Sequence, residues 1–514
     1  MKKKFFCFVQ ALLMVLLVGC KSGEEKRNTD YSGLTMPKEL DFQFNTKSFY
    51  ESGTVGSHDP CIIKDPKSGI YYSYSTDNSF DNTKPGKGIQ IRKSTDLQNW
   101  SYVGVALSEK AIIEAQDNGE GNPVTETFWA PDIKYVNGEY RLYYAATKAF
   151  GSSESRIWLA VAENAEGPFE NRGVVVSNWK DAENSGGPNS IDPDIISTQD
   201  GKSYMAYGSF FEEIYLKELG KDGLALNKNR ASEDYFGTCI AAKGGGSLDG
   251  PEGSSVIYNK DTGYYYLFLS YGWLGDTYDI RVGRSKNVQG PYEDYAGNKM
   301  NDTLWGVTTG TKLACSYKFS ATKPGGPQKN TNSDWKWGGF RAPGHGVPFQ
   351  DDNGSYYFVH HIRDGAEIYH SNSNGQSSYF MHYLMVRKME FVNGWPVLSP
   401  EPYAGEAEQP IASKYLAGNW QTILFTDDSN DQKSAVNTVL NRLNNKGEGT
   451  VNYGGTAGTW IYEADKNQII VQLQDGKTVT AKVLTCWDLE NSRPSICFTG
   501  LDSTGIAHWS KKMN

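Results

Sequence analysis

A short tyrosine-rich segment that follows a glycine recurs five times along the chain, and this repeat limits the possible folds more than any other feature. The segments are GIYYSYS from Gly69, GEYRLYYAA from Gly138, GKSYMAYGS from Gly201, GYYYLFLSYG from Gly263 and GSYYFVHH from Gly354. Their starts are separated by 69, 63, 62 and 91 residues. Aromatic and β-branched residues behind a glycine turn indicate a strand, and a recurring spacing indicates a repeated β-sheet unit.

Five such units predict an all-β fold in which a five-bladed β-propeller occupies residues 46–405. A unit of this size cannot bury both faces of its own sheet, so it packs against its neighbours, and closing the ring removes the exposed ends. Almost no stretch of the region has the apolar spacing of an amphipathic helix. A β-sandwich or a β-helix with chance clusters of tyrosine is the alternative that the repeats alone leave open.

Residues 406–514 predict a small C-terminal antiparallel β-barrel. Short alternating segments such as GNWQTILF, TAGTWIYEA, QIIVQLQ and TVTAKVLTCW are separated by Gly, Asn and Asp turns. Residues 431–445, DQKSAVNTVLNRLNN, are expected to form either a lone helix or a long loop. No convergent set of carboxylates is visible in this part, which favours a structural or carbohydrate-binding role over a second active site.

The N-terminus has the features of an export signal. MKKKFFCFVQALLMVLLVGC joins three lysines to an apolar run that is short for a membrane span. Its end resembles a bacterial lipobox, which implies removal of residues 1–19, lipidation of Cys20 and a flexible tether over residues 20–45. We therefore expect an outer-membrane lipoprotein at the cell surface that contacts the membrane only through its lipid anchor. The periplasmic face, and ordinary secretion with cleavage elsewhere, stay open as alternatives.

Charge and cysteine content exclude several classes of partner. The formal net charge is −9, and removal of residues 1–19 with their three lysines makes it more negative. Nucleic acids and anionic polymers require basic patches, so no nucleic-acid partner is expected. Cysteines other than Cys7 and Cys20 are scattered without a C-x-x-C motif, so no zinc site is implied. Cys486 and Cys497 could pair, but the sequence leaves this open.

Polar residues precede each glycine at a similar distance. Asp59, Trp129, Asp192, Glu252 and His345 lie 9 to 11 residues ahead of their glycines, and Asp132 lies 6 residues ahead. The innermost strands of a propeller line its axis, so equivalent positions meet in one small volume. A single Asp-Pro pair would be an ordinary turn former. Several carboxylates and a histidine that converge perturb one another's pKa values, which usually marks catalysis, and they suit glycoside hydrolysis by an acid and a base.

The motifs SHDP, FWAPDIKYVNGEYRLYYAA, NSIDPDI, YGSFF, GPEGSSVIY and APGHGVPF resemble those of glycoside hydrolase family 43, most closely its extracellular endo-1,5-α-L-arabinanases. The resemblance implies an inverting hydrolase that cleaves internal α-1,5-L-arabinofuranosidic bonds of arabinan, a plant pectic polysaccharide. It implies Asp59 as the general base, Glu252 as the general acid, and Asp192 as the residue that orients the acid and tunes its pKa. Glu252 departs from the usual context because its proline precedes it, so Asp249 is a rival for the acid.

The resemblance also implies residues that bind substrate and metal. Trp129 would be a sugar platform, and the other expected substrate contacts are Asn189, Ser190, Ile191, Ser209, Phe210 and Phe211, where Phe211 replaces a tryptophan of the family. His345 would anchor a central calcium ion. Calcium prefers oxygen ligands, so waters would have to fill its shell, and chemistry alone would make His345 a hydrogen-bonding loop residue. We expect a monomer.

Three alternatives to an endo-arabinanase remain open from the sequence. A relative in the family could release terminal arabinose or xylose, and the difference depends on loops such as residues 316–337. A non-catalytic glycan-binding lipoprotein would be favoured by loss of a carboxylate, but all three are present. A protein-interaction propeller predicts neither the carboxylates nor the axial histidine, and propellers as a fold host many activities.

Overall fold

The computed structural model describes residues 30–42, 53–77, 88–116, 127–149, 151, 154–179, 187–211, 213–244, 249–302, 307–319, 339–364, 382–427 and 432–513. The predicted signal peptide over residues 1–19, Cys20 and half of the predicted tether lie outside these residues, as do most of residues 316–337. Within the described ranges, none of the helices has the length and apolar character needed to cross a membrane.

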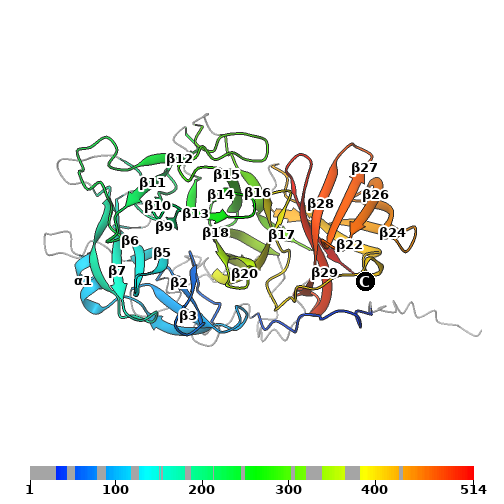
Figure 1. The fold of residues 1–514 in the computed structure, drawn as a ribbon, viewed down its shortest axis with the longest axis horizontal. Helices are drawn as coiled ribbons and strands as arrows, with labels where there is room; N and C mark the ends of the chain where they lie inside the picture. Colours follow the sequence, from blue (N-terminus) through cyan, green and yellow to red (C-terminus); the bar gives the residue numbers. More distant parts are fainter. Residues whose placement is uncertain are drawn as a thin grey trace, which may run out of the picture.

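The five tyrosine-rich repeats form the five blades of a β-propeller, so the predicted propeller fold is confirmed (Figure 1). Blades 1 to 4 are four-stranded antiparallel sheets in chain order. Blade 1 holds β1 (Cys61–Lys64), β2 (Tyr71–Ser75), β3 (Gln90–Ser94) and β4 (Ser101–Val105); blade 2 holds β5 (Thr127–Val136), β6 (Glu139–Thr147), β7 (Ser155–Ala162) and β8 (Glu170–Ser177); blade 3 holds β9 (Asp194–Ser197), β10 (Ser203–Tyr207), β11 (Glu213–Leu219) and β12 (Thr238–Ala242); blade 4 holds β13 (Glu252–Asn259), β14 (Tyr264–Tyr271), β15 (Asp279–Ser285) and β16 (Thr311–Ala314).

Blade 5 contains β18 (Phe340–Gln350), β19 (Tyr356–Asp364), β20 (His382–Val392) and β21 (Trp395–Leu398), and it is extended by β17 (Ser316–Lys318) and β23 (Gln432–Ser434). The ring closes on this blade. Residues 54–56 pair with β20: the Gly56 N–H donates to the His382 carbonyl at 2.8 Å, and the Leu384 N–H donates to the Thr54 carbonyl at 2.8 Å. The start of the propeller is thereby hydrogen-bonded to its last blade.

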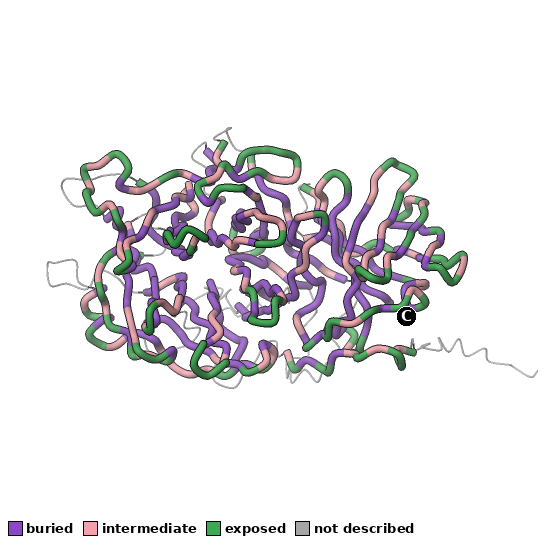
Figure 2. Tube along the Cα trace, in the orientation of Figure 1, coloured by how far each residue is buried: buried purple, intermediate pink, exposed green. Residues whose placement is uncertain are grey.

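The glycine of each repeat makes the turn between the first and second strands of its blade. Gly69, Gly138, Gly201, Gly263 and Gly354 have φ values of 73°, 91°, 82°, 67° and 88°, a left-handed conformation that glycine adopts without steric cost. The tyrosines that follow lie on the second strands, where most are buried between neighbouring sheets (Figure 2). Each repeat in the sequence therefore supplies a glycine turn and a second strand whose tyrosines are part of the hydrophobic core.

A second left-handed position lies just ahead of, or within, each innermost strand. Asp59, Ala130, Asp192, Gly253 and His345 have φ values of 50°, 42°, 57°, 59° and 46°. The innermost strands, β1, β5, β9, β13 and β18, contact one another around the axis. These five positions are therefore structurally equivalent. Trp129 and Glu252 each lie one residue earlier.

Two aspartates clamp neighbouring blades together. Asp132 and Asp194 each lie two residues after the left-handed position of their blade. Asp132 Oδ2 accepts the Ile195 N–H at 2.8 Å, and Asp194 Oδ2 accepts the Val256 N–H at 2.9 Å. Asp132 also pairs with Lys134 at 3.0 Å. Asp132, which the sequence placed among the axial residues, instead joins blade 2 to blade 3.

The C-terminal part is a closed eight-stranded antiparallel barrel, which confirms the predicted barrel. Its strands are β22 (Gly418–Leu424), β24 (Val436–Arg442), β25 (Glu448–Tyr453), β26 (Thr456–Glu463), β27 (Gln468–Leu473), β28 (Thr478–Asp488), β29 (Arg493–Asp502) and β30 (Ala507–Lys512). Helices among the described residues are α1 (Glu109–Gln116) and the 3-10 turn η1 (Ser413–Tyr415). Cys486 and Cys497 are buried free thiols on β28 and β29.

The expectation of a helix or a long loop over residues 431–445 is wrong. This segment contains β23 and β24. On β24, Thr438 and Leu440 are buried while Asn437 and Asn441 are exposed, so burial alternates along the strand. β24 pairs with both β22 and β25 and is needed to close the barrel. Strand pairing therefore overrides the helix-like spacing of Val and Leu in this segment.

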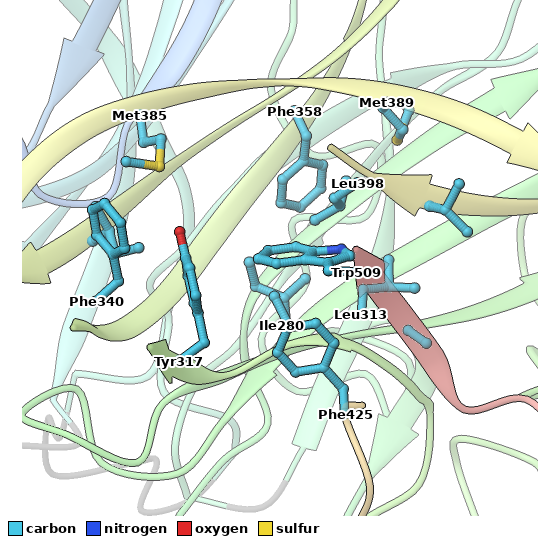
Figure 3. Packing of buried hydrophobic residues seen from close by; sticks show 14 of the residues in the cluster. Ile280, Leu313, Tyr317, Phe340, Phe358, Met385, Met389, Leu398, Phe425 and Trp509 are labelled. Carbon is cyan, nitrogen blue, oxygen red and sulfur yellow. The ribbon is translucent and has the colours of Figure 1, made fainter. Parts of the chain in front are cut away.

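The propeller and the barrel share one hydrophobic core. Trp509 of β30 packs beside Tyr317 of β17, with ring centroids 5.1 Å apart, in a cluster that also holds residues of blades 4 and 5 (Figure 3). β23, which leads into β24 of the barrel, runs parallel to β17 at the edge of blade 5. The buried Lys511 Nζ lies 2.8 Å from Glu401 of the propeller side and 2.7 Å from Asp488 of the barrel. The two parts are therefore joined by a sheet edge, a core and an ion-pair network.

Candidate active site

Four ionisable side chains face one another at the propeller axis: Asp59, Asp192, Glu252 and His345. His345 Nδ1 lies 3.1 Å from Asp59 Oδ1. Asp192 interacts electrostatically with the other three. The structure thus brings together the three carboxylates and the histidine that the sequence placed at blade starts, and it does so from blades 1, 3, 4 and 5.

Asp59 is held as a carboxylate. Its Oδ2 lies 2.6 Å from His58 Nδ1 and accepts the Thr76 hydroxyl at 2.7 Å, while its backbone N–H donates to His361 Nδ1 at 3.2 Å. Burial disfavours its charge, but the positive fields and hydrogen bonds of His58 and His345 outweigh burial and hold the pKa of Asp59 well below its usual range. Asp59 is therefore ionised and can accept a proton.

Glu252 has the opposite tendency. Burial, assisted by the negative charge of Asp59, raises its pKa, although hydrogen bonds from Tyr278 and Ser209 oppose the rise. The Ser209 hydroxyl lies 2.8 Å from Glu252 Oε2. The rival Asp249 has a side chain that is 48% exposed and is paired with Lys243 at 2.6 Å, which favours its ionised form. The geometry therefore favours Glu252 as the proton donor.

Asp192 supports the backbone beside Glu252. Its Oδ2 accepts the Gly253 N–H at 3.0 Å, across the boundary between blades 3 and 4. Burial raises its pKa to about 7, and the negative charges of Glu252 and Asp59 act in the same direction while His345 opposes them. Asp192 is thus placed both to fix the position of Glu252 and to influence its proton affinity.

His345 is the cationic member of the group. Burial disfavours its charged form, but Asp59, Asp192 and Glu252 raise its pKa to about 9. Its Nδ1 faces Asp59, which leaves Nε2 as the ring atom that could face an ion. A metal-bound histidine commonly donates its other ring N–H to a carboxylate, so this arrangement is compatible with a metal ligand once Nε2 has given up its proton. A single imidazole is a poor site for calcium unless water oxygens complete it.

The aromatic residues predicted to bind substrate are half-buried. Trp129, Phe210 and Phe211 each keep part of their surface exposed. Phe210 and Phe211 lie edge to face with ring centroids 6.2 Å apart, and the Phe210 N–H donates to the Pro251 carbonyl at 3.0 Å, beside Glu252. Half-buried rings next to the acid could stack on a sugar.

The other predicted substrate residues are buried. Asn189 Oδ1 accepts the Ser155 hydroxyl at 2.7 Å, which ties it to blade 2, and Ile191 is buried ahead of Asp192. Ser190 Oγ is buried and has no hydrogen-bond partner among the described side chains and backbone. The sequence reasoning missed Thr76, Tyr278 and His361. Only His58 carried a signal, because it directly precedes Asp59.

Comparison with known proteins agrees with this geometry. Residues 54–396 match the profile of glycosyl hydrolases family 43, and residues 400–510 match that of a C-terminal lipocalin-like domain. The chain belongs to glycosyl hydrolases family 43. This family 43 hydrolase is 30% identical over 488 residues to the extracellular endo-α-(1->5)-L-arabinanase 2 of Bacillus subtilis (strain 168), covering 89% of this chain and 93% of the relative.

Two further similarities extend over nearly the whole hydrolase. It is 29% identical over 488 residues to an extracellular endo-α-(1->5)-L-arabinanase of Thermotoga petrophila, covering 88% of this chain and 92% of the relative. The solved endo-1,5-α-L-arabinanase from Thermotoga petrophila RKU-1 in complex with TRIS has a TM-score of 0.72 at 26% identity, covering 90% of this chain and 99% of that one. The similarity therefore includes the barrel as well as the propeller.

Proposed function

We propose that this family 43 glycoside hydrolase cleaves internal α-1,5-L-arabinofuranosidic bonds of arabinan with inversion. The observation that carries the proposal is that two carboxyl groups at the propeller axis have different partners. Asp59 lies 2.6 Å from His58 and 3.1 Å from His345, which lowers its pKa, whereas Glu252 accepts the Ser209 hydroxyl at 2.8 Å and has a raised pKa. Two titratable groups whose environments drive their pKa values apart are suited to the roles of base and acid. Relatives named as endo-arabinanases match the chain over nearly its full length.

The mechanism follows from these protonation states. Glu252 donates its proton to the oxygen that leaves the anomeric carbon, while Asp59 takes a proton from the water that attacks the same carbon from the opposite face. The glycosidic bond breaks as the new carbon–oxygen bond forms, and the proton lost by Glu252 is replaced from solvent. Asp192 holds the Gly253 N–H, and hence the backbone next to Glu252, in place.

The test of the reaction uses linear debranched arabinan. Internal cleavage lowers the viscosity of the solution faster than reducing ends appear, and the first products are oligosaccharides. Release of arabinose alone from the first time points would instead show an exo-acting enzyme. Binding without any hydrolysis would show a glycan-binding protein. Product anomers followed by NMR test inversion.

The calcium proposal assigns His345 as the protein ligand, with water oxygens as the remaining ligands. When bound there, the ion would supply positive charge near the carboxylates. The test is metal analysis of the protein as purified and after chelation, with a comparison of His345→Ala. Loss of one bound calcium in the variant supports the assignment, and an unchanged metal content contradicts it.

We further propose that the protein is a monomeric lipoprotein attached through Cys20 and exposed at the cell surface. The relatives named above are extracellular enzymes, which supports export but not a particular anchor. Labelled palmitate should be incorporated by the native chain and lost in Cys20→Ser. Protease added to intact cells distinguishes the surface from the periplasm, and light scattering measures the oligomeric state.

A further inference from the structure

Three aromatic rings are stacked on one another next to Glu252 and Asp59, the proposed acid and base. Tyr278 and His361 have ring centroids 5.7 Å apart with planes inclined by 9°, and His361 and His58 have centroids 4.3 Å apart with planes inclined by 16°. The Tyr278 hydroxyl is near enough to Glu252 to act on its carboxyl group as a hydrogen-bond donor, which opposes the rise in the pKa of Glu252. At the other end, His58 Nδ1 lies 2.6 Å from Asp59 Oδ2. The stack therefore reaches from one catalytic carboxyl group to the other.

The middle ring is fixed on several sides. His361 Nδ1 accepts the Asp59 N–H at 3.2 Å, so its other ring nitrogen carries the proton. His361 is fully buried, and burial together with the positive charge of His58 lowers its pKa well below its usual range, so the ring is neutral. His382 packs edge-on against both His58 and His361, with centroids 4.1 Å and 4.9 Å away.

The backbone of blade 5 is shaped to admit the outer ring. A Cβ added to Gly344 would lie 1.9 Å from Cδ1 of Tyr278, so no side chain fits at this position while the tyrosine ring is in place. Gly344 directly precedes His345 and pairs with His361 in the ladder between β18 and β19. The space for Tyr278 is therefore part of the same turn that presents His345.

The three histidines are better explained by packing than by metal binding. Ring nitrogens of His58, His361 and His382 lie within 4.8 Å of one another, which would also suit a metal. However, the rings of His58 and His361 are nearly parallel, so their in-plane lone pairs run side by side and do not converge on one point. His361 Nδ1 is already occupied by the Asp59 N–H.

We infer that the Tyr278–His361–His58 stack is a positioning device that fixes the general acid relative to the general base, with the Tyr278 hydroxyl orienting Glu252. This rests on the roles proposed above for Glu252 and Asp59. An inverting hydrolase needs a defined separation between the two carboxyl groups, because a water molecule and the sugar must fit between them. Small displacements of such groups cost large factors in rate. Tyr278 and His361 are thus positioning residues of the reaction.

The experiment is Tyr278→Phe, which keeps the stacked ring and removes the hydroxyl. Substrates are aryl glycosides of an α-1,5-L-arabino-oligosaccharide with phenols of graded acidity, together with linear arabinan. A badly oriented acid matters most when the departing oxygen needs a proton. We expect kcat on arabinan and on the poorest phenols to fall about 10- to 100-fold, with little change in KM, whereas the most acidic phenol leaves almost as fast as from the native enzyme.

Tyr292→Phe is the matched control. Tyr292 is a buried tyrosine of blade 4 whose hydroxyl donates to the Val288 carbonyl at 2.8 Å, away from the axis. It should keep native kinetics on every substrate. Gly344→Ala provides a second variant, because its methyl group must displace the Tyr278 ring while the hydroxyl remains. If it folds, as judged by circular dichroism, it should show the same dependence on the leaving group as Tyr278→Phe.

An equal loss of rate across all phenols, or native kinetics in Tyr278→Phe, would overturn the inference. The aryl substrates measure how much the reaction depends on proton donation by Glu252, and they do so without the polysaccharide. If the native enzyme cleaves aryl substrates but leaves arabinan intact, the proposed substrate is wrong, and the dependence on phenol acidity still decides the role of Tyr278. Loss of a bound transition metal in His361→Phe would show that the histidines form a metal site instead.

Discussion

Glu252 and Asp59 have opposite proton affinities within one buried site because their neighbours differ. Asp59 is surrounded by two histidines and a threonine hydroxyl, whereas Glu252 receives two neutral hydroxyl groups and faces a negative charge. Burial alone would raise the pKa of both groups. The difference between acid and base is therefore produced by single side chains, His58 and His345 above all.

The acid and the base should respond differently to the leaving group. Glu252→Ala should lose about 10²- to 10⁴-fold on arabinan, the range of positioned proton transfer, but keep much of its rate with an acidic aryl leaving group that departs without a proton. Asp59→Ala should be inactive on both substrates because water must still be activated. Steady-state kinetics on the two substrates measure this. If Asp249→Ala shows the dependence on the leaving group and Glu252→Ala does not, Asp249 is the acid.

Asp192 should set the alkaline limb of the pH profile. The acid must be protonated, so activity falls as pH rises through the pKa of Glu252, and a raised pKa carries activity to higher pH. Asp192→Asn keeps an oxygen for the Gly253 N–H but removes a negative charge next to Glu252. Glu252 then releases its proton more easily, so the alkaline limb of kcat/KM should move to lower pH. If the alkaline limb does not move and only kcat falls, Asp192 orients Glu252 without changing its pKa.

At the scale of single residues, the sequence predicted the catalytic carboxylates but not the side chains that hold them in position. Shared spacing and the family resemblance singled out Asp59, Asp192, Glu252 and His345, and the structure places all four at the axis. Tyr278 had no sequence signal because it lies in a loop outside the repeated motif, and His361 had none because it ends the fifth tyrosine-rich segment at a place where the other four carry no histidine. Their role arises from contacts between blades, which spacing along one chain does not encode.

At the scale of the element, each blade has the same left-handed position on or just ahead of its innermost strand, and the function of this position depends on the residue that occupies it. Asp59, Asp192 and His345 supply charge, whereas Ala130 and Gly253 do not. Two residues further on, aspartates of blades 2 and 3 join one blade to the next. Residues with proposed catalytic roles and residues that join neighbouring blades are therefore only two positions apart in the sequence.

Asp132→Ala tests this separation. It leaves the buried Ile195 N–H without its acceptor, which should lower the free energy of unfolding by about 2 kcal/mol. Thermal and urea unfolding measure the loss. Asp132→Asn keeps an acceptor oxygen and should lose less. The kcat of both folded variants should stay native, since Asp132 faces the blade boundary. A large fall in kcat at native stability would instead place Asp132 in the active site.

The sequence predicted strands where a glycine turn and an aromatic segment recur. It did not predict strands whose formation depends only on pairing with a neighbouring strand. The five second strands follow from the glycines and tyrosines. β24 was missed because Val, Leu and Asn at its spacing suit a helix as well as a strand, and closure of the barrel selects the strand. The three-residue β23 is too short for any periodic signal, and its parallel pairing with β17 comes from the other part of the chain.

At the scale of the whole molecule, the propeller and the barrel are built as one body. The shared core around Trp509, the β23–β17 pairing and the Lys511 network all cross the boundary between them. A barrel that only bound sugar at the end of a tether would need none of these contacts. The barrel therefore supports blades 4 and 5 from outside the ring.

Trp509→Ala should uncouple the two parts. Trp509 is 1% exposed and packs against Tyr317, Phe425 and the Arg387 guanidinium, so truncation should cost about 3–5 kcal/mol. Calorimetry should show one transition for the native chain and two for the variant. Trp460→Ala, which opens a cavity inside the barrel, should lower the transition temperature without splitting it. Two transitions in the native protein would contradict the shared core.

The closure of the ring by residues 54–56 has a consequence for the order in which the chain is made. These residues precede the first blade strand, yet their partners on β20 follow more than 300 residues later, and the β23 edge of the same blade later still. Contacts so distant along the chain form late. The propeller therefore cannot close until blade 5 has been synthesised, so the ring stays open until most of the chain has been made.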